Sequence, residues 1–374
     1  MNIPRFYQQL DSYLKPNKVL VLYGPRQVGK TTLLTDYLKN TKYKYRLDFG
    51  EDIRIREVLE SNNFKKIKDY AAGYELLAID EAQKIPGVGN SLKIIVDQIP
   101  GIRVIATGSS SFDLAGQIGE PLTGRKITLI LYPVAQIELQ EQHNPFELRG
   151  RLEDYLIHGS YPEVAAAENP KEKARILGEI TSSYLLKDIL ALDKVKGSQI
   201  LVDLLRLLAF QIGSEVSLSE IGQKLRIDYK TVARYIDLLE KNFVLFTLRG
   251  YSRNLRNEIT KKAKYFFFDT GIRNTLIANL NPLELRNDIG MLWENFLILE
   301  RQKKLSYREI PANLYFWRTW QQQEIDLIEE REGRLFAYEF KWSGKARAPK
   351  AFIEAYPQAE FQIVNKDNYL DFVT

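Results

Sequence analysis

Short apolar runs alternate with helical patterns over the first third of the chain. Between residues 18 and 133 the runs are KVLVLYG, YKYRLDF, YELLAID, IRVIATG and ITLILYP. Buried parallel strands read as short continuous apolar stretches, and the helices between them supply the crossovers that parallel strands require. The pattern therefore predicts an α/β fold for this part, with a parallel sheet and helices on both faces.

The remaining two thirds of the chain change pattern twice. Residues 134 to about 195 are helical in pattern, and from 196 to about 270 helices precede a pair of strands. After the connector NLNPLELRNDIG comes one helix followed by alternating strands. We expect four parts: the α/β core 1–133, a helical lid or linker 134–195, a third part 196–270 and a small α/β domain 271–374.

The third part has the element order of a winged helix. Asp228 precedes a helical segment and can cap it, while Val232, Ile236 and Leu239 recur at helical spacing and should face a core. The strand FVLFTL follows, then a basic loop and a second strand near KKAKYFFF. Helix, turn, helix and a two-stranded wing are therefore expected.

The last part contains a hairpin whose register follows from its turn. Gly333 supplies the positive φ that a two-residue turn needs, so Arg331 should pair with Arg334. Counting back pairs Glu324 with Lys341, Ile325 with Phe340, Asp326 with Glu339 and Leu327 with Tyr338. One face of the hairpin should be apolar and the other charged. Trp317 and Trp320, just before it, are expected to pack in the core and at its edge.

Composition limits the chemistry. The chain has 374 residues, no cysteine and two histidines, His143 and His158. Disulfides, thiolate catalysis and histidine-rich metal sites are therefore excluded, and any metal should be a hard cation held by oxygen. The net charge of +5 permits nucleic-acid binding without requiring it. The start has no apolar signal core and no apolar run could span a bilayer, so we expect a cytoplasmic protein that makes no membrane contact.

A glycine-rich loop follows the first expected strand. GPRQVGKT, from Gly24 to Thr31, matches the pattern G-x-x-x-x-G-K-[ST], and a helical segment follows it. Backbone N–H groups of such a loop, with the start of the helix, surround phosphates. Lys30 would reach the β- and γ-phosphates of ATP, and the Thr31 hydroxyl would hold Mg²⁺. The expected nucleotide-binding residues of this loop are Gly24, Pro25, Arg26, Gln27, Val28, Gly29, Lys30, Thr31 and Thr32.

Two acids, Asp80 and Glu81, stand at the end of the run YELLAID and directly after it. The carboxyl end of a buried parallel strand faces the ligand crevice. Asp80 would therefore bind Mg²⁺, and Glu81 would polarise the attacking water.

Hydroxyls and one arginine complete the candidate nucleotide site. Thr107, Ser109 and Ser110 end the run that begins with Arg103, where they would either sense the γ-phosphate or make local turn bonds. Arg125 would stabilise the transferring phosphoryl group, within the chain or across a subunit interface, unless it is an ordinary surface residue.

These motifs resemble those of the AAA-type ATPases of the P-loop superfamily. GPRQVGKTTLL, DEAQ and TGSSS occur in the order found in one prokaryotic family of such ATPases, and LTGR, YPE and the final EFK are similar to it as well. The resemblance spans nearly the whole chain. It implies ATP binding and hydrolysis, and a C-terminal region whose role is poorly defined.

The expected winged helix carries basic residues off its apolar stripe. Lys230 and Arg234 would enter or flank a groove of DNA, and the wing residues Arg249 and Arg253 would lie on phosphate. Winged helices in ATPases also serve as lids or protein contacts, so a protein partner is the alternative.

The hairpin acids suggest a second chemical centre. Without a metal, the carboxylates of Asp326 and Glu339 would repel each other and destabilise the sheet. A divalent cation between them would make the pairing favourable. Glu294 could add a carboxylate, and Lys341 could orient water or stabilise charge on phosphate. The set resembles the restriction-endonuclease-like fold of the PD-(D/E)xK type. It predicts a Mg²⁺ site of Glu294, Asp326 and Glu339; the alternative is an inherited fold with a solvated site, in which Lys341 pairs with Glu324.

Three functions remain open at this point. The first is an ATPase that acts on DNA through a winged-helix and nuclease-like module. The second is an ATP-switched DNA-binding protein with an inactive nuclease fold, and the third is an ATPase that regulates a protein partner. The oligomeric state stays open, and with it whether Arg125 acts within its own chain.

Overall fold

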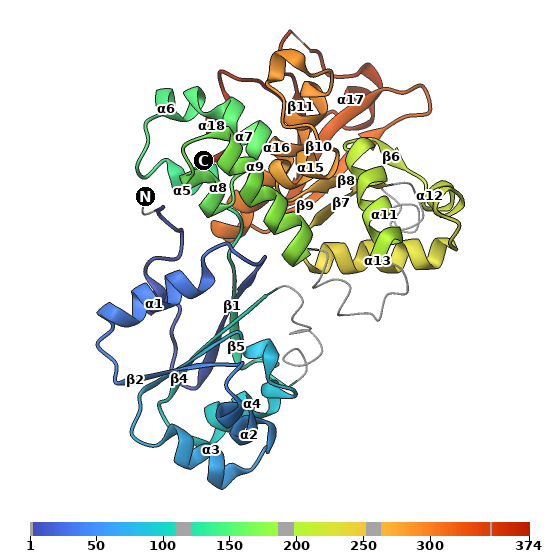
Figure 1. Cartoon of the computed structure of the whole chain (residues 1–374). Helices are drawn as coiled ribbons and strands as arrows, with labels where there is room; N and C mark the ends of the chain where they lie inside the picture. Colours follow the sequence, from blue (N-terminus) through green and yellow to red (C-terminus); the bar gives the residue numbers. More distant parts are fainter. Residues whose placement is uncertain (1–2, 110–120, 186–197, 252–262, 345) are drawn as a thin grey trace. The chain divides into compact units, whose positions relative to one another are not determined.

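The structure is a computed structural model, which describes residues 3–109, 121–185, 198–251, 263–344 and 346–374. The chain forms two compact units (Figure 1). The first is Arg5–Tyr132, and the second is Pro133–Thr374 together with residues 1–4.

The first unit is built on a five-stranded parallel sheet in the order β2-β3-β4-β1-β5 (Figure 1). Its elements are η1 (Leu10–Ser12), β1 (Lys18–Gly24), α1 (Lys30–Asn40), β2 (Tyr45–Phe49), α2 (Ile53–Glu60), α3 (Phe64–Ala71), β3 (Leu76–Asp80), η2 (Ala82–Lys84), α4 (Val88–Gln98), β4 (Arg103–Ser109) and β5 (Lys126–Ile130). This order places β4 directly between β1 and β3, so the ends of these three strands meet at one edge.

Helices cover both faces of this sheet, as the sequence predicts. Side chains of α2, α3 and α4 pack with Val19 and Val21 of β1 in one buried cluster. Leu20 and Leu22 alternate with these positions and therefore point to the other face, where they are buried as well. Helix α1 packs against β1 and covers that face.

The second unit contains a mixed seven-stranded sheet in the order β12-β11-β10-β9-β7-β8-β6. Helices precede it: α5 (Gln136–Leu139), α6 (Pro145–Gly150), α7 (Leu152–His158), α8 (Pro162–Ala166), α9 (Pro170–Glu179), the π-helix η4 (Ile180–Leu185) and α11 (Ser198–Phe210). The middle elements are β6 (Glu215–Val216), α12 (Leu218–Leu225), α13 (Tyr229–Lys241), β7 (Leu245–Gly250) and β8 (Ala263–Phe267). The last are α15 (Thr270–Leu276), η5 (Leu283–Leu285), α16 (Ile289–Tyr307), β9 (Asn313–Arg318), β10 (Glu324–Arg331), β11 (Arg334–Phe340), α17 (Lys350–Ala355), β12 (Glu360–Val364) and α18 (Tyr369–Val373).

The helices and strands expected for a winged helix are present. Asp228 caps α13 by accepting bonds from the N–H groups of Lys230 and Thr231, at 2.9 and 3.0 Å. The apolar stripe of α13 is buried. Strands β7 and β8 pair antiparallel, and β6 adds to β8. The segment between β7 and β8 includes residues 252–262, which lie outside the described part.

The wing strands continue into the sheet of the last region. β7 pairs in parallel with β9, through Arg249 with Tyr315 and Gly250 with Phe316. One sheet therefore crosses the expected border near residue 270, and the expected division of residues 134–374 into three parts stays a prediction.

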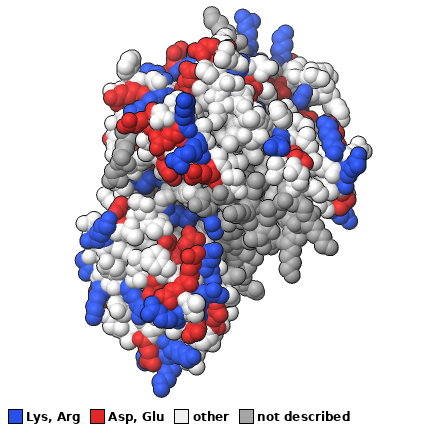
Figure 2. Space-filling model, viewed as in Figure 1, with Lys and Arg blue, Asp and Glu red and all other residues white. Residues whose placement is uncertain are grey.

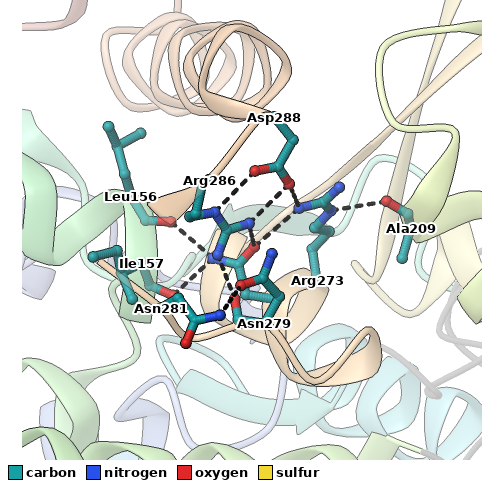
Figure 3. A network of polar contacts seen from close by, with 9 residues as sticks. Leu156, Ile157, Ala209, Arg273, Asn279, Asn281, Arg286 and Asp288 are labelled. Carbon is teal, nitrogen blue, oxygen red and sulfur yellow. Dashed lines mark hydrogen bonds and ion pairs between the residues drawn. The ribbon is translucent and has the colours of Figure 1, made fainter. Parts of the chain in front are cut away.

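A buried polar network ties the helices of this unit together (Figure 3). Arg273 of α15 donates to the carbonyl oxygen of Ala209 in α11, at 2.8 Å, and pairs with Asp288. Arg286 donates to both oxygens of Asp288, at 2.8 and 2.9 Å, and to the Asn279 carbonyl. Because Asp288 precedes α16, the network fixes the start of that helix against α11 and α15.

The hairpin β10–β11 has the predicted register from its turn as far as Leu327 and Tyr338, and the predicted pairs beyond them, such as Asp326 with Glu339, stay a prediction. Arg331 pairs with Arg334, and Leu327 pairs with Tyr338. Trp317 lies in β9 and is buried, but Trp320 is 99% exposed, so the prediction of packing is wrong for Trp320. The reason is that β9 ends at Arg318, and Trp320 falls in the turn before β10.

In the described part of the chain, no helix combines the length and hydrophobicity needed to cross a membrane.

Candidate functional site

The phosphate-binding loop joins β1 to α1. Gly29 adopts φ 89°, the left-handed conformation, and α1 begins at the next residue. Lys30 is 5% exposed, and its Nζ donates to the carbonyl oxygens of Gly24 and Pro25, at 2.9 and 2.7 Å. The first N–H groups of a helix have no partner within it and carry positive potential. An ammonium group and a helix start thus meet at this loop.

An acid from β3 lies directly beside the loop. Asp80, 2% exposed, accepts a hydrogen bond from the Thr31 hydroxyl at 2.7 Å. Its other oxygen accepts from Thr107 on β4, the strand between β1 and β3. Thr31 and Asp80 thus offer adjacent hard oxygen atoms, which fits Mg²⁺ when phosphate oxygens supply further ligands.

The residue after β3 has an unusual backbone. Glu81 adopts φ 52°, and its N–H donates to the Thr107 hydroxyl at 3.1 Å. The Gln83 amide donates to the Glu81 carboxylate and, at 3.1 Å, to the Ser109 hydroxyl. A non-glycine residue in this conformation is strained, and the surrounding structure must hold it there. Gln83 and Thr107 are two such supports. Ser110 lies outside the described residues.

Gly50, just after β2, packs closely against the backbone of this strained residue. Its N–H donates to the Asp80 carbonyl at 2.7 Å. A Cβ atom added at Gly50 would lie 2.2 Å from the carbonyl oxygen of Glu81. Only a residue without a side chain fits there, so Gly50 permits the observed position of Glu81.

Arg5 reaches the phosphate-binding loop from the start of the first unit. Its guanidinium is buried, donates to the Val28 carbonyl, and donates to the Tyr132 carbonyl at 2.6 Å. Arg5 therefore joins the loop to Tyr132, the last residue of the unit.

Arg125 lies at the edge of the sheet opposite the phosphate-binding loop. The Val19 N–H donates to the Arg125 carbonyl at 2.8 Å, which places Arg125 beside the amino end of β1. The loop lies at the carboxyl end, about 20 Å away along the strand. The Arg125 guanidinium pairs with Asp97 at 2.6 Å. The prediction that Arg125 acts on phosphate within its own chain is therefore wrong, and action across a subunit interface stays a prediction.

The expected DNA-binding residues come from two elements. Lys230 and Arg234 are exposed on α13, and their spacing of four places them on one side of the helix. Arg249 is exposed on β7 and lines a cavity of about 310 Å³ with residues of β9 and α16. Arg253 lies outside the described residues. On the face shown in Figure 2, basic and acidic side chains are interspersed over both units.

The hairpin acids lie near a lysine that sequence reasoning missed. Lys264 of β8 is 2% exposed, and its Nζ lies 2.9 Å from Glu294 of α16 and 2.5 Å from Glu324 of β10. Lys341 pairs with Glu339 at 2.7 Å rather than with Glu324. We call these residues, together with Asp326, the acidic cluster: Lys264, Glu294, Glu324, Asp326, Glu339 and Lys341.

Burial and mutual repulsion shift the titration of this cluster. Burial raises the pKa of Glu294, and the pKa of Asp326 is raised by burial and then by Glu294 and Glu339. Burial alone would lower the pKa of Lys264, but the carboxylates of Glu294 and Glu324 outweigh it and raise that pKa. The two carboxylates therefore favour the protonated form of Lys264.

The predicted Mg²⁺ set of Glu294, Asp326 and Glu339 is wrong as a ligand arrangement. Among the described residues, no group of three or more histidine, aspartate or glutamate side chains is arranged to hold a metal ion. Glu294 is paired with Lys264, Glu339 is paired with Lys341, and Asp326 accepts the N–H of Phe340 at 2.7 Å. These acids accept hydrogen bonds and ion pairs from groups of the protein itself. As a ligand set, they do not fit the metal that the nuclease-like resemblance implies.

Sequence reasoning missed the residues whose roles depend on distant contacts. Arg5 and Gly50 lack any motif, and their partners lie 127 and 31 positions away. Gln83 stands in the quoted motif DEAQ, so its position was visible although its bond to Ser109 was not. Lys264 is one of several lysines in a basic stretch, and no pattern distinguishes it.

Three family models match successive parts of the chain. The model described as AAA domain matches residues 16–140. Residues 16–140 are an AAA domain of the P-loop type. Two models described as domains of unknown function, DUF8612 and DUF4143, match residues 149–284 and 289–372.

Two relatives of the chain have names that state no function. The uncharacterized protein Rv2008c of Mycobacterium tuberculosis is 28% identical over 326 residues, covering 86% of this chain and 70% of the relative. The uncharacterized protein MJ1544 of Methanocaldococcus jannaschii is 23% identical over 380 residues, covering 96% and 83%. Similar chains therefore occur in a bacterium and in an archaeon, and neither name states an activity.

Two solved structures share weak similarity with the chain. One is the STAND ATPase PH0952 of Pyrococcus horikoshii, with a TM-score of 0.26, 14% identity, and coverage of 79% of this chain and 44% of that one. The other is AMPPCP-bound DnaA of Aquifex aeolicus, with a TM-score of 0.27, 18% identity, and coverage of 63% and 84%. Scores this low support no argument about this chain.

Proposed function

We propose that the protein binds and hydrolyses ATP in its first unit and that the nucleotide state controls how its second unit contacts DNA. The observation that carries the ATPase part is the convergence of Lys30, Thr31 and Asp80 at one edge of the sheet. Thr31 lies in the first turn of α1, which follows β1, and Asp80 ends β3. Strand β4 lies between β1 and β3, yet the two side chains are 2.7 Å apart. This arrangement supplies a cation for phosphates and oxygens for Mg²⁺.

Each residue of the site has a distinct role in this proposal. Lys30 binds the β- and γ-phosphates, and Thr31 and Asp80 hold Mg²⁺, which neutralises charge on the transferring phosphate. Glu81 accepts a hydrogen bond from the attacking water and orients it. Gln83, bonded to both Glu81 and Ser109, keeps the carboxylate in place.

Two substitutions separate binding from hydrolysis. Lys30→Ala should lose both, because the cation that contacts phosphate is gone. Glu81→Gln should still bind ATP, but phosphate release should fall at least about a hundredfold, because a neutral amide is a poor general base. Glu51→Gln is the matched control, since Glu51 is exposed, with its side chain 72% accessible, and lies two residues after the carboxyl end of β2. Normal hydrolysis by Glu81→Gln would remove Glu81 from the mechanism.

The DNA part rests on α13. This helix is capped at its start and buried along its apolar stripe, and it presents Lys230 and Arg234 to solvent. Such a helix can lie in a DNA groove while basic side chains contact phosphate. We do not extend the proposal to DNA cleavage, because the ligand set for its metal does not form.

Retention of the full chain on duplex DNA, measured across salt concentrations, tests this part. Lys230→Ala with Arg234→Ala should weaken binding and reduce the salt slope by about two, one for each lost phosphate contact. The matched control is Lys171→Ala with Arg175→Ala, which removes the same residue types at the same spacing from the exposed face of α9. An equal loss of DNA affinity in both double variants would mean that the net charge of the protein, and not a specific surface on α13, causes the binding.

A protein partner is the competing use of the same helix. It is favoured if wild type fails to bind duplex DNA at low salt, with and without ATP. The interspersed charges of Figure 2 are compatible with such a contact.

A further inference from the structure

The acidic cluster contains a buried cation from an element that contributes none of the expected metal ligands. Lys264 comes from β8, a wing strand, whereas the acids come from α16, β10 and β11. Its ammonium contacts Glu294 and Glu324 and is 2% exposed. The packing of α16 explains why Lys264 reaches these acids. Helix α16 packs against both β8 and β11, and β7 lies between β8 and β9 in the sheet.

Most polar atoms of the cluster have internal partners. Arg318 lies 3.7 Å from Glu324, Lys341 binds Glu339, and the Phe340 N–H binds Asp326. In the described part of the chain, the second oxygen of Glu339, Oε2, is buried without a hydrogen-bond partner. One such oxygen does not make a site, because Mg²⁺ requires near-ideal octahedral coordination by several oxygens.

A divalent cation would also meet opposition in this place. It would have to share Glu294 with Lys264, whose charge also acts on Asp326, and two positive charges in a buried site repel strongly. Removing Lys264 from its acids would leave either an unpaired buried ammonium or a displaced wing strand, both of which are costly.

We propose that Lys264 is the resident cation of the acidic cluster, and that the cluster is an ion-pair centre joining the wing strand β8 to α16 and to the hairpin. The cluster then does not bind Mg²⁺ and does not cut nucleic acid. Its role is to hold the proposed DNA-contacting wing on the C-terminal sheet. This inference goes beyond the proposed function, since it holds whether or not α13 binds DNA.

Mn²⁺ binding by the full chain without nucleotide tests the proposal directly. Free Mn²⁺, followed by its electron paramagnetic resonance signal, should show no binding to wild type that depends on Asp326. Lys264→Met keeps the length of the side chain and removes its charge, so this variant should bind one Mn²⁺ at least about tenfold more tightly than wild type. Adding Asp326→Asn to Lys264→Met should abolish that gain.

A second buried lysine provides the matched control. Lys303 is 2% exposed and pairs with Glu300 at 2.6 Å in a different part of the unit. Lys303→Met removes a buried ammonium of the same kind, and it should create no Mn²⁺ site, because the hairpin acids are not near it.

Two results would overturn the proposal. One is a stoichiometric Mn²⁺ site in wild type that Asp326→Asn removes, which would show that the acids bind metal with Lys264 present. The other is a folded Lys264→Met variant that gains no Mn²⁺ affinity. Should Lys264→Met fail to fold, the comparison of wild type with Asp326→Asn still decides the first result.

Discussion

Gly50→Ala tests whether the position of Glu81 controls catalysis. The added Cβ would lie 2.2 Å from the Glu81 carbonyl oxygen, and 3.0 Å is a distance below which real contacts of this kind essentially do not occur. Relief requires the backbone at Glu81 to move by about 1 Å, and a displacement of this size at a reacting group can cost about a hundredfold in rate. The phosphate-binding loop is untouched.

The expected result is therefore a split between kcat and KM. Steady-state phosphate release by the full chain should show kcat lowered about a hundredfold, equivalent to about 2.7 kcal/mol of barrier. The KM for ATP should stay within about threefold, because the Lys30 contacts remain.

A second glycine controls for lost stability. Gly73 adopts φ +79°, so Gly73→Ala strains the same unit by about 1–2 kcal/mol without crowding Glu81. Gly73→Ala should lower the melting temperature and leave kcat unchanged. A fully folded Gly50→Ala protein with kcat within threefold of wild type would refute the reasoning, since it would show that the chemistry tolerates displacement of Glu81.

Three further predictions follow from single residues. Arg5→Ala removes the donor to the Val28 carbonyl and should raise the KM for ATP about tenfold, through a less ordered loop, while Arg5→Lys recovers part of it; an unchanged KM in both would exclude this support. Arg125→Ala should leave kcat per chain within about twofold in samples that light scattering shows to be monomeric, whereas a large loss there would contradict the position of Arg125. Burial, and then Arg301, lowers the pKa of Lys304 to about 8. The unfolded chain keeps this proton up to about pH 10, so the free energy of unfolding should rise between about pH 8 and 10. Lys304→Met should flatten that rise in denaturant titrations. Equal slopes of the unfolding free energy against pH in both proteins would contradict the shift.

Local patterns predicted the first unit well. The apolar runs gave its parallel strands, because buried strands of this kind need continuous apolar residues. The glycine-rich loop lay between strand and helix as expected, and the turn at Gly333 fixed the hairpin register. In these cases the decisive interactions lie within a few residues of one another.

Features set by distant contacts were beyond sequence reasoning. Arg125 is an exception, because it precedes β5, and in a parallel sheet the residue before a strand lies at the edge opposite the loop that follows β1. Lys264 joins the acids because α16 packs against both β8 and β11, an arrangement that no local pattern encodes. The same charged residues therefore read as a metal site in the sequence and as an ion-pair centre in the structure.

The central claim is that the loop from Gly24 to Thr31 binds the phosphates of ATP. Calorimetric titration of the full chain with a non-hydrolysable ATP analogue and Mg²⁺ measures this directly. We predict one binding event per chain, weakened about tenfold to a hundredfold in Lys30→Ala through loss of a charge-assisted contact. Absence of binding by wild type, or equal affinity in Lys30→Ala, would contradict the claim.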